Sequence, residues 1–387
     1  MSGQDPTGSD DPFGDLGFLG DLARMLSNQS GGTWDAARQL AVTVATDGRS
    51  EPNVDPGARI ALEQIARAAE LRVAEATGLS TGGIDVVAVT RSMWASRSVD
   101  AYRPVLEHMR GAFSPPVDDT GDPAMAMMGS LFSAMGPMML GLAAGSMVGH
   151  LARHSLGQYD LPLPRASRDL LLVPANIDEV VADWSLAADD LRMWVCVNEF
   201  ASHVVLSVPH VHERFNKLLH DYAAAFEPDA GRLEEQLGGL DPTDPTALAN
   251  LQERFGDPDV LFGAIISDRQ RELLVPLTAL VTTVVGYTDH ITDEVGARML
   301  TDPVRIAEAL RRRRVEASSA DRFVERLLGL DLTQDVYDRG RAFIDGVVER
   351  AGADALGSLW SEERFLPTPN EVDAPGLWLA RIELPTD

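Results

Sequence analysis

A long segment without a charged side chain is the strongest constraint that the sequence places on the fold. Residues 124–149 read AMAMMGSLFSAMGPMMLGLAAGSMVG, and 26 such residues are enough to cross a bilayer as a helix. Gly141, Gly145 and Gly149 recur at the four-residue spacing that lets two helices pack closely. The segment is therefore either a membrane span or a helix buried among other helices.

The composition of this segment favours the protein core. It is rich in Gly, Ala and Met rather than in Leu, Ile and Phe, and Pro137 interrupts its middle. It has no aromatic belt, and its acidic flanks show no positive charge bias toward either side. We expect a buried hairpin or kinked helix, and a membrane-associated protein anchored by residues 124–149 is kept as an alternative.

Apolar residues at helical spacing predict a mainly α-helical protein with a few short strands. Asp55 followed by Pro56 is a typical helix start, whereas GIDVVAVT at 83–90 and residues 170–173 are short β-branched or apolar runs typical of strands. The C-terminal stretch 360–382 is punctuated by prolines and is expected to be extended. The helices are expected in two segments within 13–46 and over 56–77, 99–112, 186–208, 210–226, 271–300 and 305–328, with another starting near 178.

Shifts in composition divide the chain into regions. Residues 1–12 are expected to form a disordered tail, and residues 13–114 an N-terminal helical region. The linker PPVDDTGDP then leads into a main domain over 124–387. Within it, residues 227–259 carry nine acidic and two basic residues and are expected to form a solvated excursion.

The charge of the chain argues against two classes of partner. Its net charge is −26, so nucleic acid and anionic membrane surfaces should repel it. One basic run, Arg311–Arg314, goes against this trend and is expected to be the solvated end of a helix. The composition therefore leaves the partner unknown, with a peptide or protein ligand compatible with it.

The single cysteine and the first residues of the chain indicate a cytoplasmic protein. Cys196 excludes an internal disulfide and a CxxC metal site, and its apolar surroundings (MWVCV) are typical of a buried, unreactive thiol. The opening MSGQDPTGSDDPFGDLG lacks the basic and apolar parts of a secretion signal.

The segment NEFASHVVLSVPHVHERF, 198–215, resembles a zinc-peptidase helix whose metal ligands are missing. Such a helix carries His-Glu-x-x-His, with two histidines one turn apart and a glutamate that acts as the general base. Here Glu199 is present, but Asn198 and Ser202 take the two histidine positions, and neither is a good zinc ligand. The two lie on one helical stripe, formed by Leu191, Val195, Asn198, Ser202 and Val205.

A site in a shifted register is an alternative. His203 follows Glu199 by four residues, which places both side chains on one helix face. A zinc ion held by these residues, with His290 as a further ligand, would make the protein an active metal-dependent hydrolase.

A later helix, within TTVVGYTDHITDEVG at 282–296, resembles the helix that supplies the third zinc ligand. One class of zinc peptidase has an acidic ligand there, followed by an aspartate four residues later. Asp289 is present, but the ligand position holds Val285. The sequence has no P-loop, no GxGxxG after a strand and no GxSxG, so nucleotide-dependent and serine-hydrolase chemistry have no support.

These motifs together resemble the actinobacterial zincin-like metallopeptidases, a family classed as hydrolases with a sister branch associated with deazaflavin-coenzyme biosynthesis. The resemblance covers most of the chain. It is carried by residues 11–41, LGQYDLPLP at 156–164, NEFASHVVLSVPHVHERF, VVGYTDHI at 284–291, the RRRR run, LLGLDL, YDRGRAF and LPTPNEVDAPGLWLARI.

The resemblance implies a zincin-like fold over 124–387 with N-terminal helical additions, and zinc-dependent peptide hydrolysis. It puts Asn198, Ser202 and Val285 at the three ligand positions, Glu199 at the general-base position and Asp289 at a supporting carboxylate. Because no ligand position holds a metal-binding residue, we expect a degenerate HExxH protein that needs no cofactor and acts in binding or as a scaffold. Zinc is expected only in the shifted-site alternative.

Overall fold

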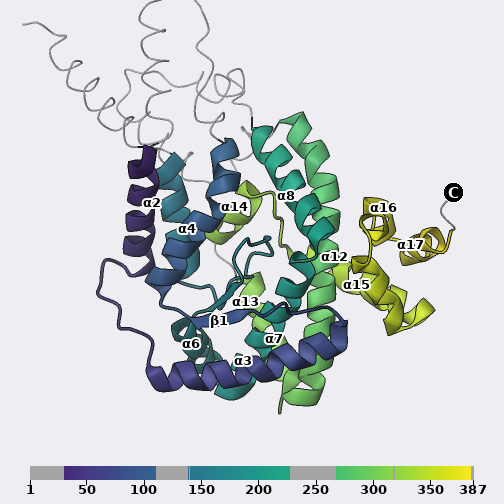
Figure 1. Cartoon of the computed structure of the whole chain (residues 1–387), viewed down its shortest axis with the longest axis horizontal. Helices are drawn as coiled ribbons and strands as arrows, with labels where there is room; N and C mark the ends of the chain where they lie inside the picture. Colours follow the sequence, from purple (N-terminus) through teal and green to yellow (C-terminus); the bar gives the residue numbers. More distant parts are fainter. Residues whose placement is uncertain (1–29, 110–137, 139, 227–266, 317–318, 385–387) are drawn as a thin grey trace, which may run out of the picture.

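The structure is a computed structural model that describes residues 30–109, 138, 140–226, 267–316 and 319–384 (Figure 1). It is mostly helical, as predicted from the sequence, and the helices surround one small sheet. The predicted tail at 1–12 and the acidic excursion at 227–259 lie outside the described residues. The elements are α2 (Ser30–Ala45), α3 (Pro56–Thr77), β1 (Asp85–Ala88), α4 (Arg91–His108), a helix over Leu140–Ala152, β2 (Asp169–Leu172), α6 (Pro174–Trp184), α7 (Ala188–Leu206), α8 (Pro209–Ala224), α12 (Asp268–Met299), α13 (Pro303–Val315), α14 (Ser319–Leu327), α15 (Gln334–Ala351), the 3₁₀ helices η2 (Ala353–Trp360) and η3 (Glu363–Phe365), α16 (Pro369–Val372) and α17 (Pro375–Ile382).

Local signals set the ends of the helices. The side chain of Asp55 caps α3 by accepting a hydrogen bond from the amide of Ala58, and Gly78 ends the helix in the left-handed conformation. Ser267 and Gln270 form a reciprocal capping box at the start of α12. The predicted start of α3 is therefore confirmed, and α12 begins three residues before its predicted boundary.

The two predicted strands form a parallel pair. Val86 of β1 is in register with Leu170 of β2, and the three leucines of β2 are buried. The amide of Val173, just after β2, donates a hydrogen bond to the carbonyl of Leu156, and Gly157 bridges to Leu172. These bonds hold the LGQYD loop, residues 156–160, against the sheet.

The glycine spacing in the charge-free segment corresponds to a close contact between helices. In the helix Leu140–Ala152, a Cβ added at Gly145 would lie 2.5 Å from the carbonyl oxygen of Ala37, and one at Gly149 would lie 2.6 Å from that of Ala41. The described end of the segment is thus packed against α2.

The long helix α12 runs through the centre of the molecule, with α7 and α15 packed against it (Figure 1). It meets α15 where Gly286 and Gly340 face each other, so closely that a Cβ on either would clash with the other backbone. Among the described residues, α12 alone is long and apolar enough to cross a membrane, but 67% of its most apolar stretch is buried in the protein. Burial of this extent is typical of a core helix.

The predicted extended C-terminus is wrong. Residues 360–382 form a series of short helical turns because Pro369 and Pro375 each stand at the start of a helix, where a missing N–H costs nothing. Glu371 then binds Arg381, which ties α16 to α17. Helix α4 also begins at Arg91 rather than near Val99, because Thr90 caps it by accepting a hydrogen bond from the amide of Met93.

Candidate functional site

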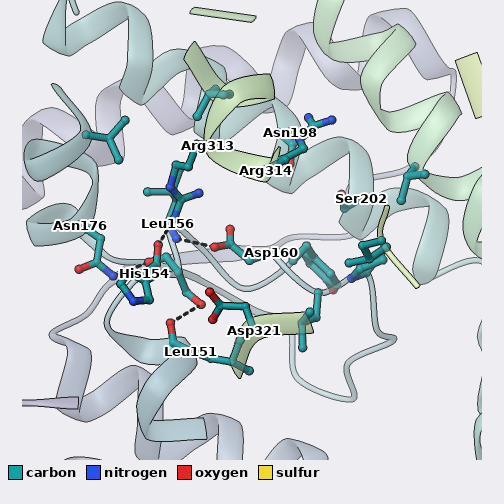
Figure 2. Close-up of a pocket in the computed structure, with 18 of the residues that line it drawn as sticks. Leu151, His154, Leu156, Asp160, Asn176, Asn198, Ser202, Arg313, Arg314 and Asp321 are labelled. Carbon is teal, nitrogen blue, oxygen red and sulfur yellow. Dashed lines mark hydrogen bonds between the residues drawn. The ribbon is translucent and has the colours of Figure 1, made fainter. Parts of the chain in front are cut away.

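A cavity of about 430 Å³ opens between α7, α12 and the LGQYD loop (Figure 2). Helices α6, α13 and α14 contribute further walls, together with residues 151–155 and Tyr337 of α15. A cavity of this size can hold a small molecule or one end of a peptide.

Four of the residues singled out in the sequence line this cavity. Asn198 and Ser202 reach it from neighbouring turns of α7, and Val285 and Asp289 reach it from neighbouring turns of α12. Ser202 is 4% exposed and Val285 is 6% exposed, so both belong to the inner wall. The three positions that the resemblance assigns to zinc ligands therefore share one cavity, although Ser202 and Val285 are 83 residues apart in the sequence.

The residues at these positions do not fit a zinc ion. Zinc in proteins is bound by thiolate, imidazole or carboxylate groups. The three positions offer an amide, a hydroxyl and a hydrocarbon side chain. Within the described ranges, no three His, Cys, Asp or Glu side chains are grouped so that they could hold a metal ion. The donor set therefore lacks what a zincin site requires.

Glu199 lies beside the cavity but is occupied by the backbone. One carboxylate oxygen accepts a hydrogen bond from the amide of Gln158 at 2.8 Å, and the same oxygen accepts one from the amide of Tyr159 at 2.9 Å. The side chain is 2% exposed, and a Cβ at Gly157 would lie 2.3 Å from its Cδ. Glu199 thus fills a slot beneath the LGQYD loop that only glycine at 157 leaves open.

A second carboxylate completes the support of this loop. Asp160 accepts a hydrogen bond from the amide of Leu156 at 3.0 Å, while Glu199 accepts those of Gln158 and Tyr159, so the two acids together bind three backbone amides of the loop. Burial and the charge of Asp160 raise the pKa of Glu199 well above its usual value, and burial likewise raises the pKa of Asp160. Repulsion between the carboxylates of Glu199 and Asp160 therefore disfavours the state in which both are ionised.

His203 is bound to the side chain of Tyr159 in the LGQYD loop. Its Nδ1 lies 2.9 Å from the hydroxyl of Tyr159, and burial lowers the pKa of the imidazole to about 4. Glu199, His203 and His290 do not form a group that could hold a metal ion. The shifted metal site considered from the sequence is therefore not assembled, because the partners of Glu199 and His203 are the backbone and the side chain of the LGQYD loop.

Asp289 is bound to an arginine that the sequence suggested would be solvated. Its two oxygens accept hydrogen bonds from Arg314, each at 3.1 Å. The guanidinium of Arg314 also lies 4.1 Å from the centre of the Tyr337 ring. The expectation of a solvated RRRR run holds for Arg311 and Arg312, which pair with Glu308 on the surface, but it is wrong for Arg314. The local spacing could not have indicated this, because Arg311 and Arg314 are three residues apart and lie on nearly the same helix face.

The lining of the cavity carries an excess of negative charge. Seven carboxylates and three guanidinium groups belong to it, together with His154. Burial raises the pKa of one of these carboxylates, Glu325, to about 7, and the nearby Asp321 and Asp331 add to the shift while Arg322 opposes it. The charged lining residues are Asp160, Glu179, Asp183, Asp289, Glu316, Asp321, Glu325, Arg153, Arg313 and Arg314.

Comparison with known proteins agrees with the sequence motifs at the level of the family. The family model described as "Zincin-like metallopeptidase" matches residues 33–379. A crystal structure from Chloroflexus aurantiacus, described as a "putative hydrolase with a novel fold", superposes with a TM-score of 0.63 over 91% of this chain and 99% of that chain. The two sequences are 21% identical, so this likeness concerns the fold. A search of curated proteins gave no match.

Proposed function

Because the chain belongs to the zincin-like metallopeptidase family, we propose that it is a ligand-binding member of that family without zinc-dependent hydrolase activity. One observation carries the proposal. The three side chains that face the cavity at the ligand positions are Asn198, Ser202 and Val285. At the positions that the resemblance assigns to the zinc ligands, the cavity is thus lined by an amide, a hydroxyl and a hydrocarbon side chain.

The environment of Glu199 supports the same conclusion. A general base must reach a water molecule beside the substrate, with a free lone pair aimed at it. The carboxylate of Glu199 instead accepts backbone amides, and its position beneath the loop is fixed by contact with Gly157. Without a Lewis acid to lower the pKa of water, this carboxylate gives little hydrolysis of a peptide bond.

The biological role that we propose is binding or scaffolding in the cytoplasm, with a peptide or protein as the partner. The motifs further support a place in the actinobacterial branch of the family, beside the branch associated with deazaflavin-coenzyme biosynthesis. The cavity supports a binding role, because its size and its mixed polar and apolar lining are suited to holding a ligand.

The proposal is tested by measuring metal content and by rebuilding the ligand set. Purified protein incubated with zinc and then desalted should retain much less than one zinc ion per chain. The triple substitution Asn198→His, Ser202→His and Val285→Glu should create a site that retains about one zinc ion, because the three positions share a cavity wall. The double variant that keeps Val285 is the control, and it should bind zinc more weakly.

One result would overturn the proposal in favour of an active hydrolase. That result is a tightly bound zinc ion in the unmodified protein that is lost on His203→Ala, accompanied by peptide hydrolysis that a chelator abolishes.

A further inference from the structure

Charged groups on the cavity wall have partners that lie behind the wall. Glu179 is paired with Arg91, and Oδ1 of Asp321 lies 3.3 Å from Nε2 of His150. Neither Arg91 nor His150 belongs to the lining, so both acids are compensated from outside the cavity. A charged ligand would have to compete with these partners, so the charged groups give no reason to expect one.

Two tryptophans on the cavity wall differ from the buried tryptophans of the core. Trp184 ends α6 and Trp194 lies in the second turn of α7, and both are only partly buried. The buried Trp34, Trp94 and Trp378 each donate the indole N–H to a carboxylate or carbonyl oxygen of the protein. Within the described ranges, the indole groups of the two cavity tryptophans have no such acceptor. An accessible indole with an apolar body and an unused N–H is typical of a binding surface.

Helix α7 presents a row of uncharged groups to the cavity. Trp194, Asn198 and Ser202 follow one another at intervals of about one turn, and all three line the cavity. Figure 2 shows Asn198 and Ser202 on the α7 side, away from Asp321. Neither side chain is hydrogen-bonded to another residue in the part of the chain that the structure describes. This face of α7 therefore offers an aromatic ring, an amide and a hydroxyl to a ligand.

Apolar side chains beside these groups suit a ring rather than an ion. Leu161, Pro162 and Val180 also belong to the lining. Burying an aromatic ring against them removes apolar area from water, and packing on an indole adds a further attraction. The tyrosines of the lining are less available, because Tyr159 is bonded to His203 and a guanidinium covers the Tyr337 ring.

We propose that the cavity binds a peptide through an uncharged aromatic side chain, which packs against Trp184 and Trp194, and through an adjoining peptide group, which Asn198 and Ser202 hydrogen-bond. The proposal rests on the ligand-binding function proposed above and names the class of ligand. A peptide group has one donor and one acceptor, which the amide of Asn198 matches. A cavity of about 430 Å³ has room for one such side chain and its peptide groups.

Isothermal titration of the full chain with matched probes tests the aromatic part of the proposal. The probe is Nα-acetyl-phenylalanine methylamide, and the control is the cyclohexylalanine analogue, which has a six-membered ring without π electrons and more apolar surface. We expect the phenylalanine probe to bind at least about threefold more tightly, because packing on indole adds to the burial of the ring. Equal or tighter binding of the cyclohexylalanine control would overturn the aromatic class, and so would no binding of the phenylalanine probe.

Further probes test the uncharged and the peptide parts. Nα-acetyl-lysine methylamide and Nα-acetyl-glutamate methylamide should each bind about tenfold more weakly than the phenylalanine probe, because neither has a ring to pack on the indoles. Tighter binding of either would show that charge selects the ligand. p-Cresol has the ring but no peptide group and should also bind about tenfold more weakly. If p-cresol bound as tightly as the phenylalanine probe, the ligand would be a free aromatic molecule and not a peptide.

Variants then locate the site. Trp194→Leu should weaken the phenylalanine probe by about tenfold, and Trp184→Leu serves as a second variant in case the first loses stability. Asn198→Ala should weaken it by about three- to tenfold through the lost hydrogen bond. Leu71→Ala, on the exposed face of α3, is the control and should leave binding unchanged.

Unchanged affinity in both folded tryptophan variants would remove the site from this cavity. The zinc measurements above do not depend on these titrations, so failure of the ligand class is distinguishable from failure of the proposed function.

Discussion

At the scale of single residues, Glu199 illustrates how a catalytic position can serve a structural purpose. In the sequence it stands where a zinc peptidase has its general base, and its register with Asn198 and Ser202 can be deduced without a structure. Its partners could not be deduced, because the amides of Gln158 and Tyr159 are about 40 residues away along the chain. The sequence identifies the position, and the long-range contact determines the role.

Replacing Glu199 should therefore destabilise the protein whether or not it has any enzymatic activity. Glu199→Ala leaves the amides of Gln158 and Tyr159 buried without acceptors, at a cost of about 2–4 kcal/mol in the free energy of unfolding. Chemical denaturation measures this loss. Glu213→Ala, on the exposed side of α8, is the control and should change the free energy of unfolding by less than about 0.5 kcal/mol. A fully stable Glu199→Ala protein would contradict the structural role.

The pH dependence of a milder variant gives a second measure of the same prediction. Because the pKa of Glu199 is raised in the folded protein, the folded state binds more protons than the unfolded state above about pH 4.5. Stability contributed by Glu199 is thus fully present below that pH and declines as the pH rises toward the folded pKa. The free energy of unfolding of the wild type should therefore fall relative to that of Glu199→Gln as the pH rises, by at most about 1.4 kcal/mol per pH unit. The glutamine does not titrate, so the variant lacks this pH dependence.

At the scale of elements, the helix pattern was largely predictable and the contacts between helices were not. The boundaries of α3 and the two strands follow from caps and from short apolar runs, which are local features. The prediction of an extended chain over 360–382 is wrong because prolines can start helices as well as interrupt them. The convergence of α7 and α12 on one cavity depends on packing between distant segments, which the resemblance to a family indicated and periodicity did not.

The crossing of α12 and α15 should tolerate no side chain at its centre. A Cβ on Gly286 would lie 2.4 Å from the backbone of Gly340, and neither helix backbone can yield as a flexible side chain would. Gly286→Ala should lower the free energy of unfolding by about 1–3 kcal/mol or more, measured by denaturation. Gly357→Ala is the matched control, because a Cβ there meets no atom within 4 Å. A wild-type stability for Gly286→Ala would show that the two helices lie further apart.

At the scale of the whole molecule, two segments have the length or composition of membrane spans, and the described parts of both are packed inside the protein. The helix Leu140–Ala152 lies against α2, and α12 is surrounded by α3, α7, α8 and α15. The net charge of −26 opposes adsorption to an anionic bilayer. On these two grounds we expect, as a prediction, that the protein resides in water rather than in a bilayer.

Fractionation of cells that produce the full chain tests this expectation. The protein should stay in the supernatant after high-speed centrifugation without detergent, since the apolar surface of α12 is covered by its neighbours. A soluble protein and an integral membrane protein of the same host serve as markers. Recovery in the pellet that only detergent releases, and not high salt, would favour the membrane-associated alternative.

The contact between Gly157 and Glu199 has a consequence for the history of the family. A Cβ at position 157 would overlap the Glu199 carboxyl group, so the two positions cannot change independently while the loop keeps its place. Relatives that share the proposed loss of the zinc ligands should be free to vary at 198, 202 and 285, where the cavity wall is the constraint. They should nevertheless inherit Gly157 and Glu199 as a pair. A replacement of Gly157 should occur only in sequences in which a shorter side chain has already replaced Glu199.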